Sequence, residues 1–262
     1  MSVLAPPPRV TVGRHAYAPA DVLRVLEPFV SPERLARIDA VVAGRTYAVL
    51  PVLDGLHDAG NVSAVLRSAE GLGCAAAELV ALEGRAARLA AAYKADDEQA
   101  AEAALSLRDR QGQRRVSRGA HKWLHLRAWT SRAAFLRRIR AEGYRLAVTA
   151  LRPGAQPIAA WDFTQPTALV VGNEAEGASP ELLDAADAAL LLPLDGFVQS
   201  YNVSVAAALA LYHARADRLA RQGFHGDLPP EARRTLRAHY VARAAPHAER
   251  LMRHGATPAG PS

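Results

Sequence analysis

The sequence predicts an α/β fold built around a parallel β-sheet, and three features indicate it. Apolar segments of strand length alternate with amphipathic segments of helix length between residues 46 and 223. The strand-length segments are continuous apolar runs, which is typical of parallel strands covered by helices on both faces. Glycine-containing polar turns separate the segments. We therefore expect one α/β domain over residues 46–223, flanked by a basic helical extension at 1–45 and an arginine-rich helical extension and tail at 224–262.

The N-terminal extension is expected to contain helices. Residues 1–18 include APPP and show no periodic pattern, so we expect a flexible lead. Residues 20–30 suit a short helix. Residues 31–44 carry stronger helix signals, because Ser31 is an N-cap residue, Pro32 occupies the first helical position and Gly44 follows the last turn.

The central segments justify the alternation in order. A strand at 46–55 precedes a helix at 61–73, a strand at 76–84 and an alanine-rich helix at 85–107. After a basic run come strands at 123–129, 144–151, 167–173 and 188–194, with helices at 130–143 and 179–187 and a long helix that opens at Asn202. We expect residues 229–255 to form one arginine-rich helix and residues 256–262 to be disordered.

Composition limits the function classes. The 262 residues carry a net charge of +6, and nine arginines face four acids between Arg215 and Arg253. This charge suits a polyanion such as nucleic acid, although a chain with only two lysines also uses arginine as its ordinary cation. The single cysteine, Cys74, excludes an intrachain disulfide and a cysteine metal cluster. No metal, membrane span or signal peptide is predicted, so a cytoplasmic protein is expected.

Three polar clusters remain as candidates for chemistry, since no GxGxxG fingerprint or phosphate-binding loop is present. Asn61 and Arg67 lie in HDAGNVSAVLR, Glu174 lies in GNEAEG, and Ser200, Tyr201 and Asn202 precede VSVAAALAL. Each cluster also has a purely structural interpretation. Asn61 would be a helix cap followed by an exposed arginine, and Glu174 would bind backbone amides of its own turn. The small-residue helix after Asn202 would be either interior or a self-association surface.

Taken together, these clusters resemble the SPOUT superfamily of trefoil-knotted methyltransferases, and within it the TrmH-type RNA ribose 2′-O-methyltransferases. The resemblance runs from about residue 31 to 223 and rests on HDAGNVSAVLRSAEGLG, SRGAHKWLHLR, VTAL, VVGNEAEGASPELL and LLPLDGFVQSYNVSVAAAL. It implies a knotted α/β domain, S-adenosylmethionine as cofactor, RNA as substrate and a homodimer formed through the knot region.

The resemblance also assigns site residues. The positions that match the family's functional residues are Asn61, Arg67, Glu174, Ser200 and Asn202. The cofactor, held mainly by backbone groups, would contact Thr149, Ala150, Leu151, Gly172, Leu192, Leu194, Ser200 and Tyr201. The RNA would contact Arg34, Arg37, Arg45, His121, Lys122 and Arg218.

The tRNA enzymes of this family carry basic residues at the same positions, so the resemblance implies guanosine-18 in the D-loop of tRNA as the target. Two departures concern substrate and cofactor: Gly60 stands where the tRNA enzymes often have histidine, and Tyr201 stands where leucine is usual. Ribosomal RNA as substrate, including the antibiotic-resistance type of methylation, and a catalytically silent RNA-binding protein with this fold remain the alternatives.

Overall fold

The computed structural model describes residues 5–95 and 119–257. These residues form two units: the first lies within residues 47–224, and the second combines the residues before 47 with those after 224. Residues 1–4, 96–118 and 258–262 lie outside the described part. They include the second half of the expected helix at 85–107, most of the basic run that follows it and most of the expected disordered tail.

The first unit is built on a sheet of seven parallel strands, as the apolar runs predicted. The strands lie in the order β5-β4-β3-β8-β6-β9-β7. Their bounds are β3 Val49–Asp54, β4 Ala76–Val80, β5 His125–Trp129, β6 Arg145–Thr149, β7 Gln156–Pro157, β8 Thr167–Val171 and β9 Ala188–Leu191.

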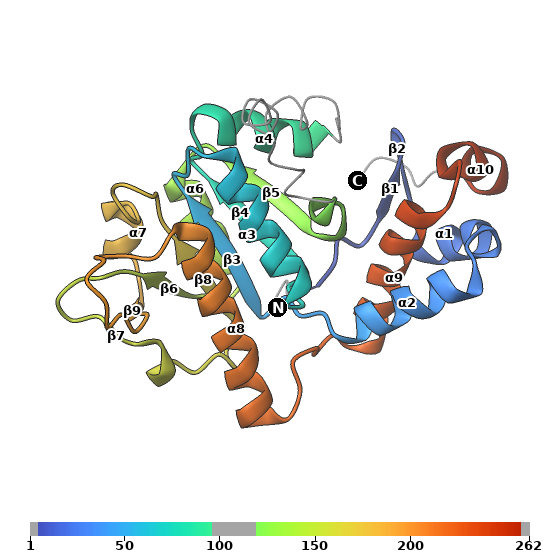
Figure 1. Ribbon diagram of the computed structural model, residues 1–262. Helices are drawn as coiled ribbons and strands as arrows, with labels where there is room; N and C mark the ends of the chain where they lie inside the picture. Colours follow the sequence, from blue (N-terminus) through green and yellow to red (C-terminus); the bar gives the residue numbers. More distant parts are fainter. Residues whose placement is uncertain (1–4, 96–118, 258–262) are drawn as a thin grey trace. The chain divides into compact units, whose positions relative to one another are not determined.

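Helices cover both faces of this sheet. They are α3 Ala59–Gly71, α4 Gly84–Ala95, α6 Arg132–Ala141, α7 Pro180–Asp184 and α8 Val203–Gln222, with short 3₁₀ turns η3 Ala120–Trp123 and η4 Ile158–Ala160. Figure 1 shows α3 and α8 side by side across β3. The six residues of β3 are all buried, which requires a layer on each face of the strand.

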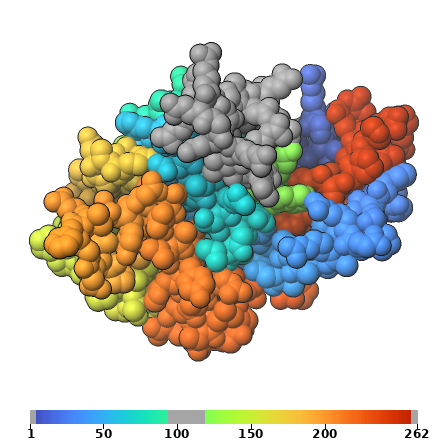
Figure 2. All heavy atoms as spheres, viewed as in Figure 1, coloured from blue at the N-terminus to red at the C-terminus, as the bar shows by residue number. Residues whose placement is uncertain are grey.

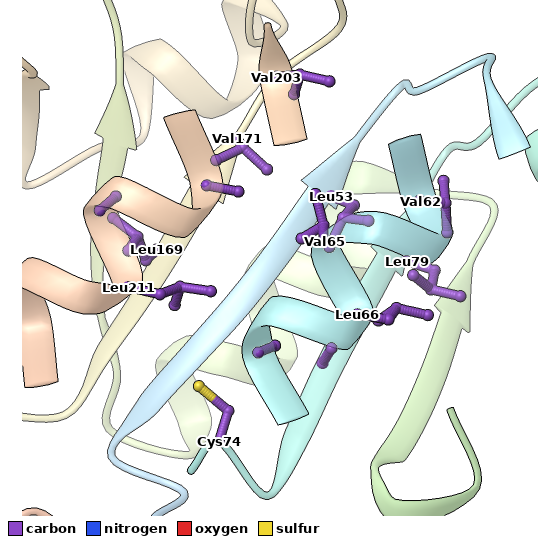
Figure 3. Packing of buried hydrophobic residues seen from close by; sticks show 14 of the residues in the cluster. Leu53, Val62, Val65, Leu66, Cys74, Leu79, Leu169, Val171, Val203 and Leu211 are labelled. Atoms are coloured by element: carbon purple, nitrogen blue, oxygen red, sulfur yellow. The ribbon is translucent and has the colours of Figure 1, made fainter. Parts of the chain in front are cut away.

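The hydrophobic core lies between the sheet and the pair α3 and α8. Val62, Val65 and Leu66 of α3 and Leu211 of α8 pack toward strand residues such as Leu53 (Figure 3). Cys74, the single cysteine, is buried in the same cluster and is 1% exposed. The two helices that carry the polar clusters are therefore fixed to the sheet by apolar packing.

Parallel strands end at one edge of the sheet, and this edge gathers the polar clusters. β3 ends at Asp54, β6 at Thr149, β8 at Val171 and β9 at Leu191, and the register pairs neighbouring strands close to these ends. The loops that leave these strands lead into the N-termini of α3 and α8 and into the GNEAEG turn. In α/β sheets, ligands bind outside this carboxyl edge.

The second unit is a helical assembly with a small hairpin. It contains β1 Val10–Val12, β2 His15–Tyr17, α1 Pro19–Leu26, η1 Glu27–Phe29, α2 Pro32–Ala43, α9 Pro230–Ala244 and α10 Ala248–Gly255. The predicted Ser31 cap is confirmed, because its hydroxyl accepts the N–H of Arg34 at 3.3 Å. Arg237 of α9 binds Glu27 and Asp39, so the N- and C-terminal extensions fold together.

Two expectations for this unit are wrong. Residues 10–17 form the antiparallel hairpin β1–β2 instead of a flexible lead, and Gly13, with φ of 60°, supplies the turn that its two short strands need. Residues 229–255 form two helices, because Pro246 interrupts them: it has no N–H to continue α9, and Ala245 before it is extended with ψ of 129°. Among the described helices, none combines the length and apolar character that a membrane crossing needs.

Candidate functional site

Three predicted residues from distant parts of the sequence are joined by hydrogen bonds. The Nδ2 atom of Asn61 donates to Oε1 of Glu174 at 2.8 Å. The Nδ2 atom of Asn202 donates to Oδ1 of Asn61 at 3.4 Å. The resulting chain, Asn202 to Asn61 to Glu174, links the N-terminus of α8, the N-terminus of α3 and the turn after β8.

Each amide in this chain is held by its helix. Asp58 is the N-cap of α3, since its Oδ1 accepts the N–H of Asn61 at 2.8 Å. Asn61 is therefore not the cap of α3, and its side chain is left for Glu174. Asn202 is the N-cap of α8, and its Oδ1 accepts both the N–H of Ser204 at 2.9 Å and its hydroxyl at 2.6 Å. These bonds leave Nδ2 of Asn202 to donate to Asn61.

The turn that carries Glu174 is tightly folded. The side chain of Asn173 donates to the carbonyl of Gly55 at 2.8 Å and accepts the N–H of Ala175 at 2.8 Å. The backbones of Asn173 and Gly177 pair with each other. Gly172 must be glycine, because a Cβ there would lie 2.0 Å from the backbone nitrogen of Ala178. The folded turn fixes the direction in which the side chain of Glu174 points.

Asp54 lies at the same edge of the sheet, and it is not among the residues that the sequence predicts for the site. Its carboxylate is 1% exposed and accepts Nε of Arg132 at 2.7 Å and the N–H of Ser179 at 2.8 Å. Asp54 thus ties the end of β3 to the starts of α6 and α7. An acidic residue that ends an apolar strand was the available signal. For Asn173 and Ser204 the sequence offered no comparable signal beyond their proximity to Glu174 and Asn202.

Arg67 lies on the same helix as Asn61 but further along it. Six residues separate them, which is about 9 Å along the helix axis. Its side chain is on the exposed face of α3, whereas Leu66 beside it is buried. A guanidinium in this position faces outward, as contact with a bound polyanion requires.

The predicted cofactor positions come from neighbouring strands. Thr149 ends β6, and Ala150 and Leu151 follow it; the Thr149 hydroxyl donates to the carbonyl of Val170 at 3.0 Å, and Leu151 is 67% exposed. The remaining positions of this set are Gly172 after β8 and Leu192, Leu194, Ser200 and Tyr201 after β9. Because β6 pairs with both β8 and β9, the three segments meet at one edge.

These residues suit an adenosine-containing cofactor. Within the described part of the chain, the N–H groups of residues 194–200 make no backbone–backbone hydrogen bond, so they are available for polar ligand atoms. The exposed side chain of Leu151 offers an apolar surface for a flat ring. Backbone recognition of this kind needs no side-chain fingerprint, which agrees with the lack of one in the sequence.

The predicted RNA-binding residues divide into two groups. Arg34 and Arg37 are exposed on α2, and His121 and Lys122 are half-buried in η3. Arg45 and Arg218 are each 1% exposed and do not present a guanidinium to an RNA phosphate in this structure. Arg45 lies over the ring of Tyr240, and Nη1 of Arg218 donates to the carbonyl of Phe163 at 2.9 Å.

A buried ion-pair network lies away from the strand ends. Arg127 of β5 binds Glu78 in the middle of β4 and Glu142 at the end of α6. Burial raises the pKa of Glu78, and the hydrogen bonds from Arg127 and Trp129 only partly offset it. Burial also acts to raise the pKa of Glu142, but hydrogen bonds from Arg127 and Arg138 outweigh it and lower that pKa. The network ties β4 and β5 to α6.

Comparison with known proteins agrees with the geometry. The profile of the SpoU rRNA Methylase family matches residues 83–212. A tRNA (guanosine(18)-2'-O)-methyltransferase from Thermus thermophilus is 33% identical over 186 residues, which cover 71% of this chain and 84% of the relative.

Two crystal structures are similar in fold. The A. aeolicus TrmH/SpoU tRNA modifying enzyme matches with a TM-score of 0.63 and 24% identity, covering 80% of this chain and 96% of that one. The SpoU methyltransferase AviRb from Streptomyces viridochromogenes, in complex with the cofactor AdoMet, matches with a TM-score of 0.52 and 22% identity, covering 65% of this chain and 60% of that one.

Proposed function

This chain belongs to the SpoU/TrmH family of S-adenosylmethionine-dependent RNA 2′-O-methyltransferases, and we propose that it methylates the ribose of guanosine-18 in the D-loop of tRNA. The observation that carries the proposal is the hydrogen-bonded chain Asn202–Asn61–Glu174 at the carboxyl edge of the sheet. The relative from Thermus thermophilus, whose name specifies guanosine-18 of tRNA, supports this choice of substrate. Because tRNA is its proposed substrate, we place the enzyme in the cytoplasm.

The residues of this chain have separate roles in the proposed reaction. Backbone groups of Gly172, residues 149–151 and residues 192–201 would hold S-adenosylmethionine, and when bound that cofactor supplies an electrophilic methyl group. The hydrogen bonds of the chain from Asn202 to Glu174 link the N-terminus of α8 to that of α3, and α3 to the turn after β8. A fixed site favours reaction because the reacting groups meet in a productive orientation.

Arg67 acts on the RNA by electrostatics. A guanidinium is not deprotonated in proteins, so Arg67 does not serve as a general base. It binds a phosphate next to the target nucleotide, orients the ribose 2′-hydroxyl and stabilises the negative charge that develops on its oxygen. We expect Arg67→Lys to lose most activity because lysine lacks the bidentate fork, while cofactor affinity is kept. Turnover near that of the wild type would contradict this role.

For the RNA contacts we propose a smaller set than the sequence suggests. We propose Arg34 and Arg37 of α2 and His121 and Lys122 of η3 as contacts to the RNA backbone, because these side chains are at least partly exposed. Arg45 and Arg218 are left out because both are buried and contact neighbouring parts of their own unit.

We further propose that the enzyme is a homodimer in which α8 contacts a second copy of the chain. One face of α8 is buried, whereas Val205, Leu209, Tyr212 and Leu219 are 38% to 64% exposed. Their spacing of three, four and seven residues places them along one stripe. Figure 2 shows the orange atoms of α8 at the molecular surface. An apolar stripe of this length is seldom left open in a monomer.

A direct test uses purified protein, labelled S-adenosylmethionine and unmodified transcripts. The proposal predicts methyl incorporation into tRNA and none into a transcript whose guanosine-18 is replaced. Incorporation into ribosomal RNA alone favours the rRNA alternative, which the rRNA Methylase family match keeps relevant. RNA binding without methyl transfer to either RNA identifies a catalytically silent protein.

A further inference from the structure

The segment between β9 and α8 is held at its two ends but has little internal support. Residues 195–200 are all exposed, and Phe197 at 108% and Val198 at 63% are exposed apolar side chains. In the described structure, residues 194–200 donate no backbone–backbone hydrogen bond. Regular backbone pairing therefore does not fix the conformation of this loop.

A tyrosine side chain joins the two ends of the loop. The hydroxyl of Tyr201 donates to the carbonyl of Pro193 at 2.8 Å. Proline has no N–H, so this carbonyl is the one hydrogen-bonding group that its backbone offers. The residues just outside the bond are anchored: Leu191 ends β9, and Asn202 caps α8. The bond thus closes residues 193–201 between two fixed points.

The hydroxyl group makes the bond that closes the loop, and its effect can be separated from that of the ring. Tyr201 is 36% exposed, and it is not part of the hydrophobic cluster between the sheet and helices α3 and α8 that the described residues form. The shielded part of the ring adds packing that does not depend on the hydroxyl. Phenylalanine at this position would keep the ring and lose the closing bond.

We propose that Tyr201 is a positioning residue that closes the loop 193–201 and so arranges its free backbone N–H groups for the cofactor. The inference rests on the proposed function, because the same loop supplies cofactor contacts there. A loop that is closed before binding loses less conformational freedom when the ligand arrives. One hydrogen bond of ordinary net strength corresponds to a change of about twofold to tenfold in the dissociation constant.

The test compares Tyr201→Phe with a matched control, Tyr144→Phe. Tyr144 also donates its hydroxyl to a backbone carbonyl, that of Tyr47 at 2.7 Å, but it precedes β6 at the opposite edge of the sheet. The backbone order parameters of residues 194–200 are measured by NMR relaxation on the full-length protein without cofactor. Binding of S-adenosylmethionine to the same proteins is measured by calorimetry.

We expect Tyr201→Phe to lower the order parameters of the loop and to weaken cofactor binding by about twofold to tenfold, with the control unchanged in both. Wild-type order parameters in Tyr201→Phe overturn the proposal, as do lowered order parameters with unchanged affinity. Wild-type behaviour of Tyr201→Phe combined with a defect in Tyr201→Leu assigns the effect to the ring and also overturns it. If the wild type binds no S-adenosylmethionine, the proposed function fails, and the order parameters still decide whether the hydroxyl closes the loop.

Discussion

Replacing Asn61 with aspartate should disrupt the site by turning a hydrogen bond into a repulsion. In the wild type, Nδ2 of Asn61 donates to the carboxylate of Glu174 at 2.8 Å. In Asn61→Asp, an oxygen takes the place of that donor and faces a second carboxylate. The bond to Asn202 survives, because an aspartate oxygen also accepts from Nδ2. The substitution therefore isolates one link of the chain.

The size of the effect follows from the distance and the exposure of the pair. A hydrogen bond to a charged group contributes about 1.5 to 3 kcal/mol. Two unit charges 2.8 Å apart repel by about 1.5 kcal/mol in bulk water, and the exposed position of Glu174 favours this low value over those of a protein interior. Rotation of the side chains relieves part of the repulsion. We expect a net loss of about 2 to 3 kcal/mol in transition-state stabilisation, which is about 30-fold to 160-fold in kcat/KM.

The decisive assay is a double-mutant cycle with Glu174→Gln. In the double variant, the amide of the introduced glutamine donates to the introduced aspartate, so the bond is restored with its direction reversed. Methylation of tRNA by the double variant should be at least about tenfold faster than by Asn61→Asp alone. A double variant whose defect is the product of the two single defects would refute the reasoning, provided that all four proteins melt at similar temperatures.

Three further predictions concern stability, assembly and pH. Asp54→Asn should lower the free energy of unfolding by about 2 to 3 kcal/mol in a thermal melt, because the buried carboxylate loses its charged bond to Arg132; an unchanged melting temperature would contradict it. Leu209→Glu should convert the proposed dimer to a monomer in analytical ultracentrifugation by placing a charge in the α8 stripe, whereas Arg137→Glu, at an exposed position on α6, should leave it dimeric. The hydrogen bond from Arg237 lowers the pKa of Glu27 below 4.5, so its stabilising effect is complete above that pH and is lost as the pH falls through the lower, folded-state value. Arg237→Gln should thus lose less stability than the wild type on acidification below pH 4.5, and parallel losses in pH-dependent melts would count against this pair.

The sheet was predictable because its strands are continuous apolar runs. Residues 49–54 and 167–171 are entirely buried, as parallel strands covered on both faces must be. The hairpin β1–β2 was missed because each strand has three residues, too few to show an alternating pattern. The arginine-rich composition of residues 229–255 predicts one helix, but Pro246 breaks this segment into α9 and α10.

The sequence predicts the members of the candidate site but not the contacts between them. Asn61 precedes both Glu174 and Asn202 by more than a hundred residues in the sequence, and only the fold shows that the three share hydrogen bonds. Burial of Arg45 and Arg218 could not be read from the sequence, since arginine is usually exposed. Composition likewise showed that α8 is apolar, but not which of its faces the sheet covers and which remains open.

The most direct test of the central claim is mass-spectrometric mapping of the methylated nucleotide in a tRNA treated with the purified enzyme and S-adenosylmethionine. The account predicts a single added methyl group, on the 2′-oxygen of guanosine-18, and its much slower addition by the Asn61→Asp variant. A methyl group on a base, on a different ribose, or on ribosomal RNA alone would contradict it.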